Sequence, residues 1–168
     1  MYSRKILLIL KILLCLMAVL FFSDTLGKVE IKSETLKKLV YNGILVLPLT
    51  ILVFDFFLNR SFSKNILSRT LIAGLILVTL LITPNRILFH STAWSTQYIF
   101  YRDKVDPGHQ IELQMLDMGA LGYESRKVEV WYFTGLFMVS KPVETGKPEE
   151  TDWLEINEEV NELGLKFP

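Results

Sequence analysis

The chain has 168 residues, of which 51% are hydrophobic, and its formal net charge is zero. That balance hides two unlike halves: residues 1–90 carry 11 Lys and Arg against 4 Asp and Glu, whereas residues 91–168 carry 7 against 14. A basic, apolar first part and an acidic second part indicate a membrane region over 1–90 and an aqueous domain over 91–168. An acidic domain repels polyanions, which excludes nucleic-acid binding.

Three long apolar runs lie in the first part, at residues 6–22, 39–58 and 66–83. Each is about as long as a helix must be to cross a bilayer, and three such runs exceed what a soluble chain of this size can bury in one core. We therefore predict three transmembrane helices. Bulky side chains at Leu20, Phe21 and Phe22 occupy the place where signal peptidase requires small ones, so the first run is expected to remain as an anchor.

The orientation rests on a small difference in loop composition. With the N-terminus inside, five Lys and Arg face each side of the membrane. The loop after the second run contains no acid, while the first loop dilutes its lysines with Asp24, Glu30 and Glu34. The positive-inside rule then favours a multi-pass integral membrane protein with a cytoplasmic N-terminus and an extracytoplasmic aqueous domain.

Two charged residues lie inside the predicted spans. Lys11 stands six residues beyond Lys5, and Asp55 stands five before Arg60, so each lies roughly 8–9 Å in from a flanking charge. Antiparallel first and second helices place both depths on the same membrane face. The pattern therefore allows an intramembrane ion pair between Lys11 and Asp55, with snorkelling of each side chain to the interface as the alternative.

The acidic part alternates like a small antiparallel sheet, after which a helix is expected. Strands are predicted near 96–102, 110–115, 127–133 and 136–140, with Thr134-Gly135 as a tight turn. A Pro- and Gly-containing linker follows at 141–150. Beyond it, Trp153, Ile156 and Val160 have helical spacing, which predicts a short amphipathic C-terminal helix. The expected fold class is an α+β membrane protein: three transmembrane helices, a small antiparallel β-sheet domain and this helix.

The segment between the second and third predicted strands is the most distinctive in the chain. It places apolar side chains between two glycines, and its members are Met118, Gly119, Leu121, Gly122 and Tyr123. Glycines in hairpin connections are ordinary, so the bland interpretation is a structural loop that folds back on the sheet. The alternative is an exposed tip that contacts a partner.

No residue cluster in the sequence has the type and spacing that a known chemistry requires. Asp103, Asp106 and His109 recur every three residues, but Pro107-Gly108 explains them as a turn, and a fourth metal ligand is lacking. We therefore predict no catalytic, metal or cofactor-binding residues. The expected function is that of a non-enzymatic membrane-anchored accessory or protein-interaction protein, whose partners are the lipid bilayer and either another protein or further copies of itself. The alternative is a subunit of a transporter or channel oligomer.

Overall fold

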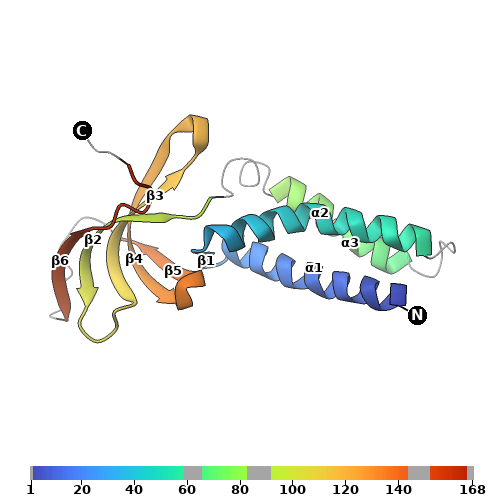
Figure 1. The fold of residues 1–168 in the computed structure, drawn as a ribbon, viewed down its shortest axis with the longest axis horizontal. Coiled ribbons are helices and arrows are strands. Elements are labelled where there is room, and N and C mark those ends of the chain that lie inside the picture. Colours follow the sequence, from blue (N-terminus) through green and yellow to red (C-terminus); the bar gives the residue numbers. More distant parts are fainter. Residues whose placement is uncertain (1, 59–65, 83–91, 144–151, 166–168) are drawn as a thin grey trace.

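The protein is described by a computed structural model that covers residues 2–58, 66–82, 92–143 and 152–165. Within these ranges it is an α+β fold of three helices and one six-stranded antiparallel sheet. The helices are α1 (Tyr2–Leu26), α2 (Glu34–Leu58) and α3 (Ile66–Ile82). The strands are β1 (Val29–Ile31), β2 (Ser95–Asp103), β3 (His109–Asp117), β4 (Tyr123–Phe133), β5 (Phe137–Pro142) and β6 (Trp153–Glu159). Helices and sheet occupy opposite ends of an elongated molecule (Figure 1).

Within the described residues, all three predicted apolar runs are helical. Helices α1 and α2 each contain a stretch long and apolar enough to cross a membrane, Lys5–Leu26 and Glu34–Phe57. Helix α3 has 17 described residues and is the shorter one. The helices bury Phe21, Ile44 and Ile51 against one another, while many of their other large apolar side chains point outward. Such outward apolar surface is what a lipid-facing helix presents.

A close approach of α1 and α2 occurs at Gly43, where a Cβ atom would lie 2.2 Å from the Met17 Sδ atom. The substitution Gly43→Leu should overpack this contact and lower the free energy of unfolding by about 1–3 kcal/mol. Thermal unfolding of the full chain in detergent measures the change, and Met17→Ala in the same chain should restore part of it. Gly74→Leu in α3 is the matched control, because apart from the neighbouring backbone of its own helix no described atom lies within 4 Å of its Cβ position. Equal losses from the two leucines would contradict this packing.

The sheet has the strand order β1-β5-β4-β3-β2-β6. Strands β2 to β5 form the predicted meander, and their ends differ from the predicted ones by no more than four residues. Strand β1 was not predicted. It lies between α1 and α2 and pairs with β5, Val29 opposite Val139 and Ile31 opposite Phe137. The first helical hairpin is therefore joined to the sheet by backbone hydrogen bonds.

The predicted C-terminal helix is wrong, because residues 153–159 form strand β6 along the edge of β2. The pairing skips a residue: Glu158 lies opposite Ile99 but Glu155 lies opposite Tyr101, so β6 carries an extra residue at a bulge. The bulge separates the two inward-leaning side chains Trp153 and Ile156 by three positions, which imitates helical spacing. Pairing also satisfies the backbone of β2, which would otherwise be an open edge. Of the predicted linker, 141–142 belong to β5, and 144–150 lie outside the described residues.

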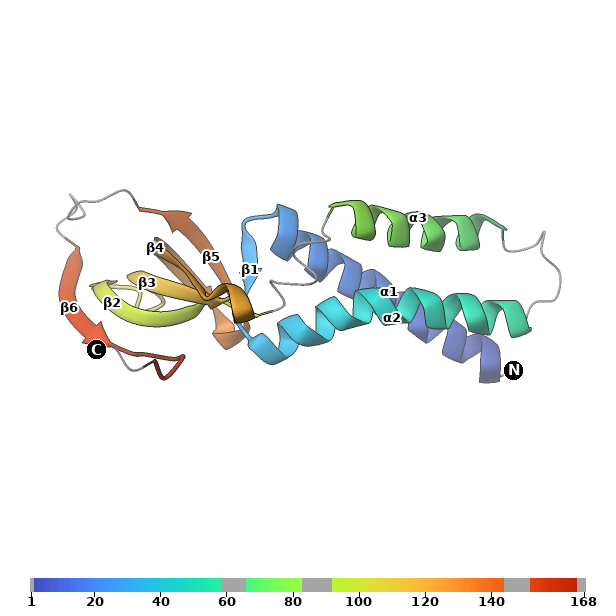
Figure 2. The same ribbon diagram turned by 90° about the horizontal axis from the view of Figure 1, so that it is seen from above.

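The strands of the sheet are curved, as Figure 2 shows from above. The hairpin of β3 and β4 projects sideways from the sheet, and along the long axis its tip lies level with the start of the helices (Figures 1 and 2). The β2–β3 turn lies at the opposite corner of the sheet. The junction between sheet and helices is therefore bordered by a projecting hairpin.

Candidate functional site

A buried carboxylate, Asp24, joins helices to sheet. It lies near the end of α1 and is 8% exposed. Its Oδ1 accepts a hydrogen bond from the Ile31 backbone N–H at 2.7 Å, and its Oδ2 accepts one from the Tyr41 hydroxyl at 2.7 Å. The Lys37 ammonium lies 3.2 Å from the same Oδ2. One side chain thus fixes α1 to β1 and to α2, and a buried charge is matched by a buried opposite charge.

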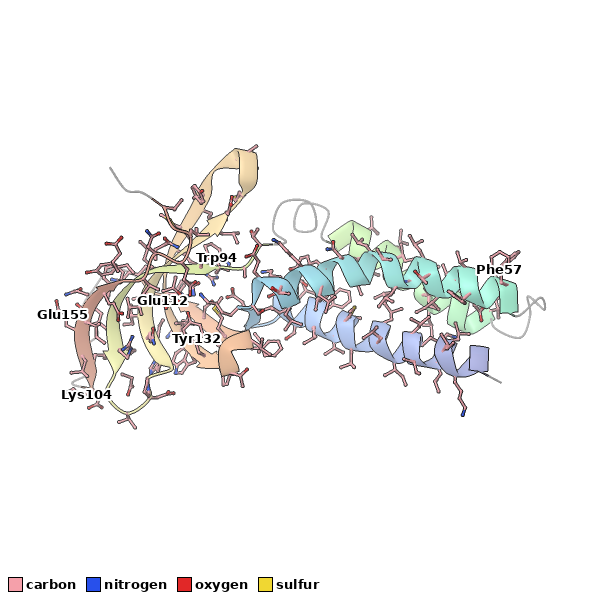
Figure 3. The ribbon with its side chains drawn as sticks, viewed as in Figure 1. Phe57, Trp94, Lys104, Glu112, Tyr132 and Glu155 are labelled. Atoms are coloured by element: carbon pink, nitrogen blue, oxygen red, sulfur yellow. The ribbon has the colours of Figure 1, made fainter. Side chains whose placement is uncertain are left out.

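A pocket of about 340 Å³ opens beside Asp24, between the helix ends and the sheet. We call it the junction pocket; its lining comprises Asp24, Thr25, Gly27, Glu30, Lys37, Tyr41, Trp94, Leu116, Glu124 and Arg126. Five of these ten residues carry a formal charge at neutral pH: three carboxylates and two cations. Figure 3 places Trp94 at the junction. The volume lies within the range of small-molecule sites in proteins.

The sheet wall of the junction pocket continues into a hydrogen-bonded chain of polar side chains on the buried face. Arg126 donates to both oxygens of Glu30, at 3.1 and 2.7 Å, and its Nε donates to Gln114 Oε1 at 2.8 Å. The guanidinium carbon lies 4.0 Å from the centre of the Trp94 ring. A bidentate carboxylate, an amide and an aromatic face together hold Arg126 in one orientation.

From Gln114 this hydrogen-bonded network continues to Glu112, which is fully buried on β3. Its Oε1 accepts from Gln114 Nε2 at 2.6 Å, from the Tyr132 hydroxyl at 2.5 Å and from Thr96 Oγ1 at 3.2 Å. Lys32 Nζ donates to Thr96 Oγ1 at 2.9 Å, so the Thr96 hydroxyl connects the Lys32 ammonium to the Glu112 carboxylate. Burial, reinforced by the Glu112 charge, raises the pKa of Tyr132 well above its ordinary value. In Figure 3 the labelled Glu112 and Tyr132 lie close together within the sheet.

No family model, curated protein or solved structure matches this chain. The functional argument therefore rests on the geometry of the chain itself.

The predicted intramembrane charges lie in the helix bundle. Asp55 is buried on α2, and Arg69 Nε of α3 donates to its Oδ2 at 2.7 Å. The sequence does not predict this partner for Asp55. The pairing of Asp55 with Lys11 stays a prediction, and Lys11 lies on α1, which packs against α2. An acid matched by a base inside apolar surroundings is the usual state of intramembrane charges.

The predicted contact loop is the tip of the β3–β4 hairpin. Its backbone is fixed by Met118 N–H bonded to Gly122 O at 2.9 Å, and by Asp117 Oδ1 accepting from Gly119 N–H at 2.7 Å. Gly119 and Gly122 have positive φ of 61° and 88°, a conformation that glycine adopts without strain. Leu121 is 66% exposed and Tyr123 is 52% exposed. The tip is thus an ordered turn that presents apolar side chains outward.

A second polar cluster lies beside the turn between β2 and β3. His109 Nε2 lies 2.8 Å from Glu129 Oε1 and its Nδ1 lies 3.2 Å from Asp103 Oδ2, while its ring stacks on Trp131 at 4.3 Å. Backbone N–H groups of Asp106 and Val105 lower the pKa of Asp103. The predicted turn holds: Asp106 O accepts from His109 N–H. Within the described residues no group of three or more His, Cys, Asp or Glu side chains has metal-binding geometry.

Sequence reasoning missed the junction pocket entirely. Its charged members are far apart in the chain. Asp24, Glu30 and Lys37 lie on α1, β1 and α2. Arg126 lies about 90 or more residues later, on β4. In the sequence, Asp24 and Glu30 are identified only as acids that dilute the lysines of the first loop. The one available signal was a loop unusually rich in both acids and bases between two apolar runs.

Proposed function

We propose that the chain is a membrane-anchored interaction protein. Helices α1, α2 and α3 cross a bilayer, the sheet stands on the extracytoplasmic surface, and the tip of the β3–β4 hairpin contacts a neighbouring membrane protein. The single observation that carries this proposal is the pairing of β1 with β5. Strand β1 lies in the connection between α1 and α2, whereas β5 belongs to the sheet that follows α3.

The pairing supports three membrane crossings, because it requires β1 and β5 to lie on the same side of the bilayer. If α1 and α2 both cross, β1 lies on one side of the bilayer and the end of α2 on the other. Strand β5 must share the side of β1, since strands bond at about 4.8 Å. The chain must therefore cross again between α2 and β2, and α3 is the described helix in that interval. The retained packing of α1 against α2 also favours an anchor over a cleaved signal.

The hairpin supports contact along the membrane plane. Its tip lies level with the helix ends and extends sideways (Figure 1), with Leu121 and Tyr123 exposed. Exposed apolar and aromatic side chains on an ordered turn are typical anchors of protein interfaces. A partner that meets this tip must have its own surface close to the bilayer.

Cysteine mapping in intact cells tests the crossings. The native Cys15 is first replaced by Ser, and Lys28→Cys, Ser61→Cys and Lys104→Cys are introduced one at a time. A membrane-impermeant maleimide should label the cysteines at 28 and 104 and leave that at 61 unlabelled until the membrane is opened. Opposite accessibility of 28 and 104 would refute three crossings, as would release of the chain by carbonate washing.

Photocrosslinking tests the contact. A photoreactive amino acid at position 121 should crosslink to a specific second membrane protein, and the adduct should be lost when Tyr123→Ser weakens the tip. The matched control is position 105 on the β2–β3 turn, where Val105 is 88% exposed but lies at the opposite corner of the sheet. Equal adducts from both positions would contradict a specific contact at the tip.

The transporter or channel alternative is favoured by one observation, the buried pair of Asp55 and Arg69 within the bundle. The pair is neutral overall, which suits helix packing as well as a path. Self-crosslinking from position 121 into a symmetric oligomer would move the proposal to this alternative.

A further inference from the structure

We propose that the junction pocket binds a phosphoethanolamine group, and that its source is the headgroup of a bilayer phospholipid. The choice of lipid as source rests on the membrane placement proposed above, whereas the headgroup chemistry rests on the pocket alone.

The phosphate would be held at the Lys37 side. An ammonium has three N–H donors, and Lys37, which is 6% exposed, has within the described residues one acceptor near its Nζ, the Asp24 Oδ2 at 3.2 Å. The Lys37 Nζ also lies over the Tyr41 ring, 5.7 Å from its centre. A buried ammonium that borders a cavity with unused donors favours an anionic oxygen in that cavity. Arg126 lines the same cavity with a guanidinium whose orientation is already fixed.

The ammonium end would be held by Glu124. This carboxylate lines the junction pocket from the start of β4 and is exposed, and its side chain makes no hydrogen bond or ion pair with any residue that the structure describes. Glu30, also in the lining, is already bonded to Arg126 and Ser140. A primary ammonium can donate to Glu124, whereas a trimethylated one cannot.

The charge of the lining argues for a zwitterion. Three carboxylates and two cations sum to −1, so a purely anionic ligand would enter against the net charge, and a purely cationic one would leave the donors of Lys37 unused. A ligand with one phosphate and one ammonium matches both ends. The pocket also lies where the helices meet the sheet, marked by Trp94 in Figure 3, which is the depth of lipid headgroups when the helices cross.

The test titrates the purified full chain, in lipid-free maltoside micelles, with phosphatidylethanolamine, phosphatidylcholine and phosphatidylglycerol that share the same acyl chains. Calorimetry gives affinity and native mass spectrometry gives stoichiometry. Phosphatidylethanolamine should bind one per chain and at least tenfold more tightly than the other two. Equal affinity for the three lipids, or no binding, would overturn the proposal.

Variants assign the site. Lys37→Met should weaken phosphatidylethanolamine binding roughly tenfold, the usual scale for losing a charge-assisted hydrogen bond. Because that variant leaves Asp24 unmatched and can fail to fold, Glu124→Gln provides an independent arm: it should weaken phosphatidylethanolamine severalfold and improve phosphatidylglycerol. Glu159→Gln, an exposed glutamate on β6 outside the pocket, is the matched control. Unchanged lipid preference in Glu124→Gln, or an equal change in Glu159→Gln, would refute the site.

A soluble arm separates the two sources of the headgroup. Glycerophosphoethanolamine, which has no acyl chains, should compete for the pocket at much lower affinity than the lipid. Affinity equal to that of the lipid would overturn the bilayer as source, and lack of competition would overturn the headgroup chemistry. This arm needs no membrane, so its outcome is independent of the cysteine mapping.

Discussion

The substitution Asp24→Ala is expected to lower the free energy of unfolding by about 3–5 kcal/mol, the usual cost of removing one partner of a buried ion pair. It would leave the buried Lys37 ammonium without its carboxylate, and would remove the acceptor of the Ile31 N–H and of the Tyr41 hydroxyl. Thermal unfolding of the full chain in detergent, followed by tryptophan fluorescence, measures the loss. The three tryptophans all lie in residues 91–168, so they report on the sheet to which Asp24 is joined through β1.

A double variant separates the contribution of the Asp24–Lys37 ion pair from that of the hydrogen bond to the Ile31 N–H. The double variant Asp24→Ala with Lys37→Met should be more stable than Asp24→Ala alone, because the unmatched charge is gone. The matched control is Glu34→Gln, which breaks an exposed pair between Glu34 and Lys38 on the same helix as Lys37 and should change stability by less than about 0.5 kcal/mol. If Asp24→Ala behaves like Glu34→Gln, the join between helices and sheet does not depend on Asp24.

The helices and the meander were predictable because their patterns are local. Apolar runs at 6–22, 39–58 and 66–83 exceed one helical face and need no tertiary information, and alternation along 110–115 identifies β3. Strand β6 was misread for an equally local reason, since a bulge on β6 gave Trp153 and Ile156 the spacing of a helix. The spacing of apolar residues shows which side chains share a face. A bulge adds one residue to that spacing, although the segment remains a strand.

The site was not predictable because its parts meet only through long-range pairing. Strand β1 has three residues, too few for alternation to identify, and yet it brings Glu30 to Arg126, 96 positions away. Asp24 and Lys37 gain their roles from the same join. Among the predicted site residues, the tip residues Leu121 and Tyr123 could be located because glycines mark a turn, whereas the partner of Asp55 on α3 depended on how the helices pack.

The substitution Tyr132→Phe should lower the free energy of unfolding by about 1–3 kcal/mol, because it removes a hydroxyl that donates to a fully buried carboxylate. The fluorescence unfolding assay used for Asp24 measures the change at neutral pH. Tyr123→Phe is the matched control, since Tyr123 is half exposed on the hairpin and its hydroxyl should contribute within about 0.5 kcal/mol.

The same variant should also change the alkaline limb of the stability profile. The folded state raises the pKa of Tyr132, through burial and the adjacent Glu112 charge, so the phenol stays protonated in the fold. Its contribution is therefore complete below the unfolded tyrosine pKa of about 10 and is lost as pH rises above that value, because the unfolded state then releases a proton that the fold retains. Relative to the parent chain, Tyr132→Phe should lose stability less steeply above pH 10. Parallel alkaline limbs for the two chains would show that the fold does not raise the pKa of Tyr132.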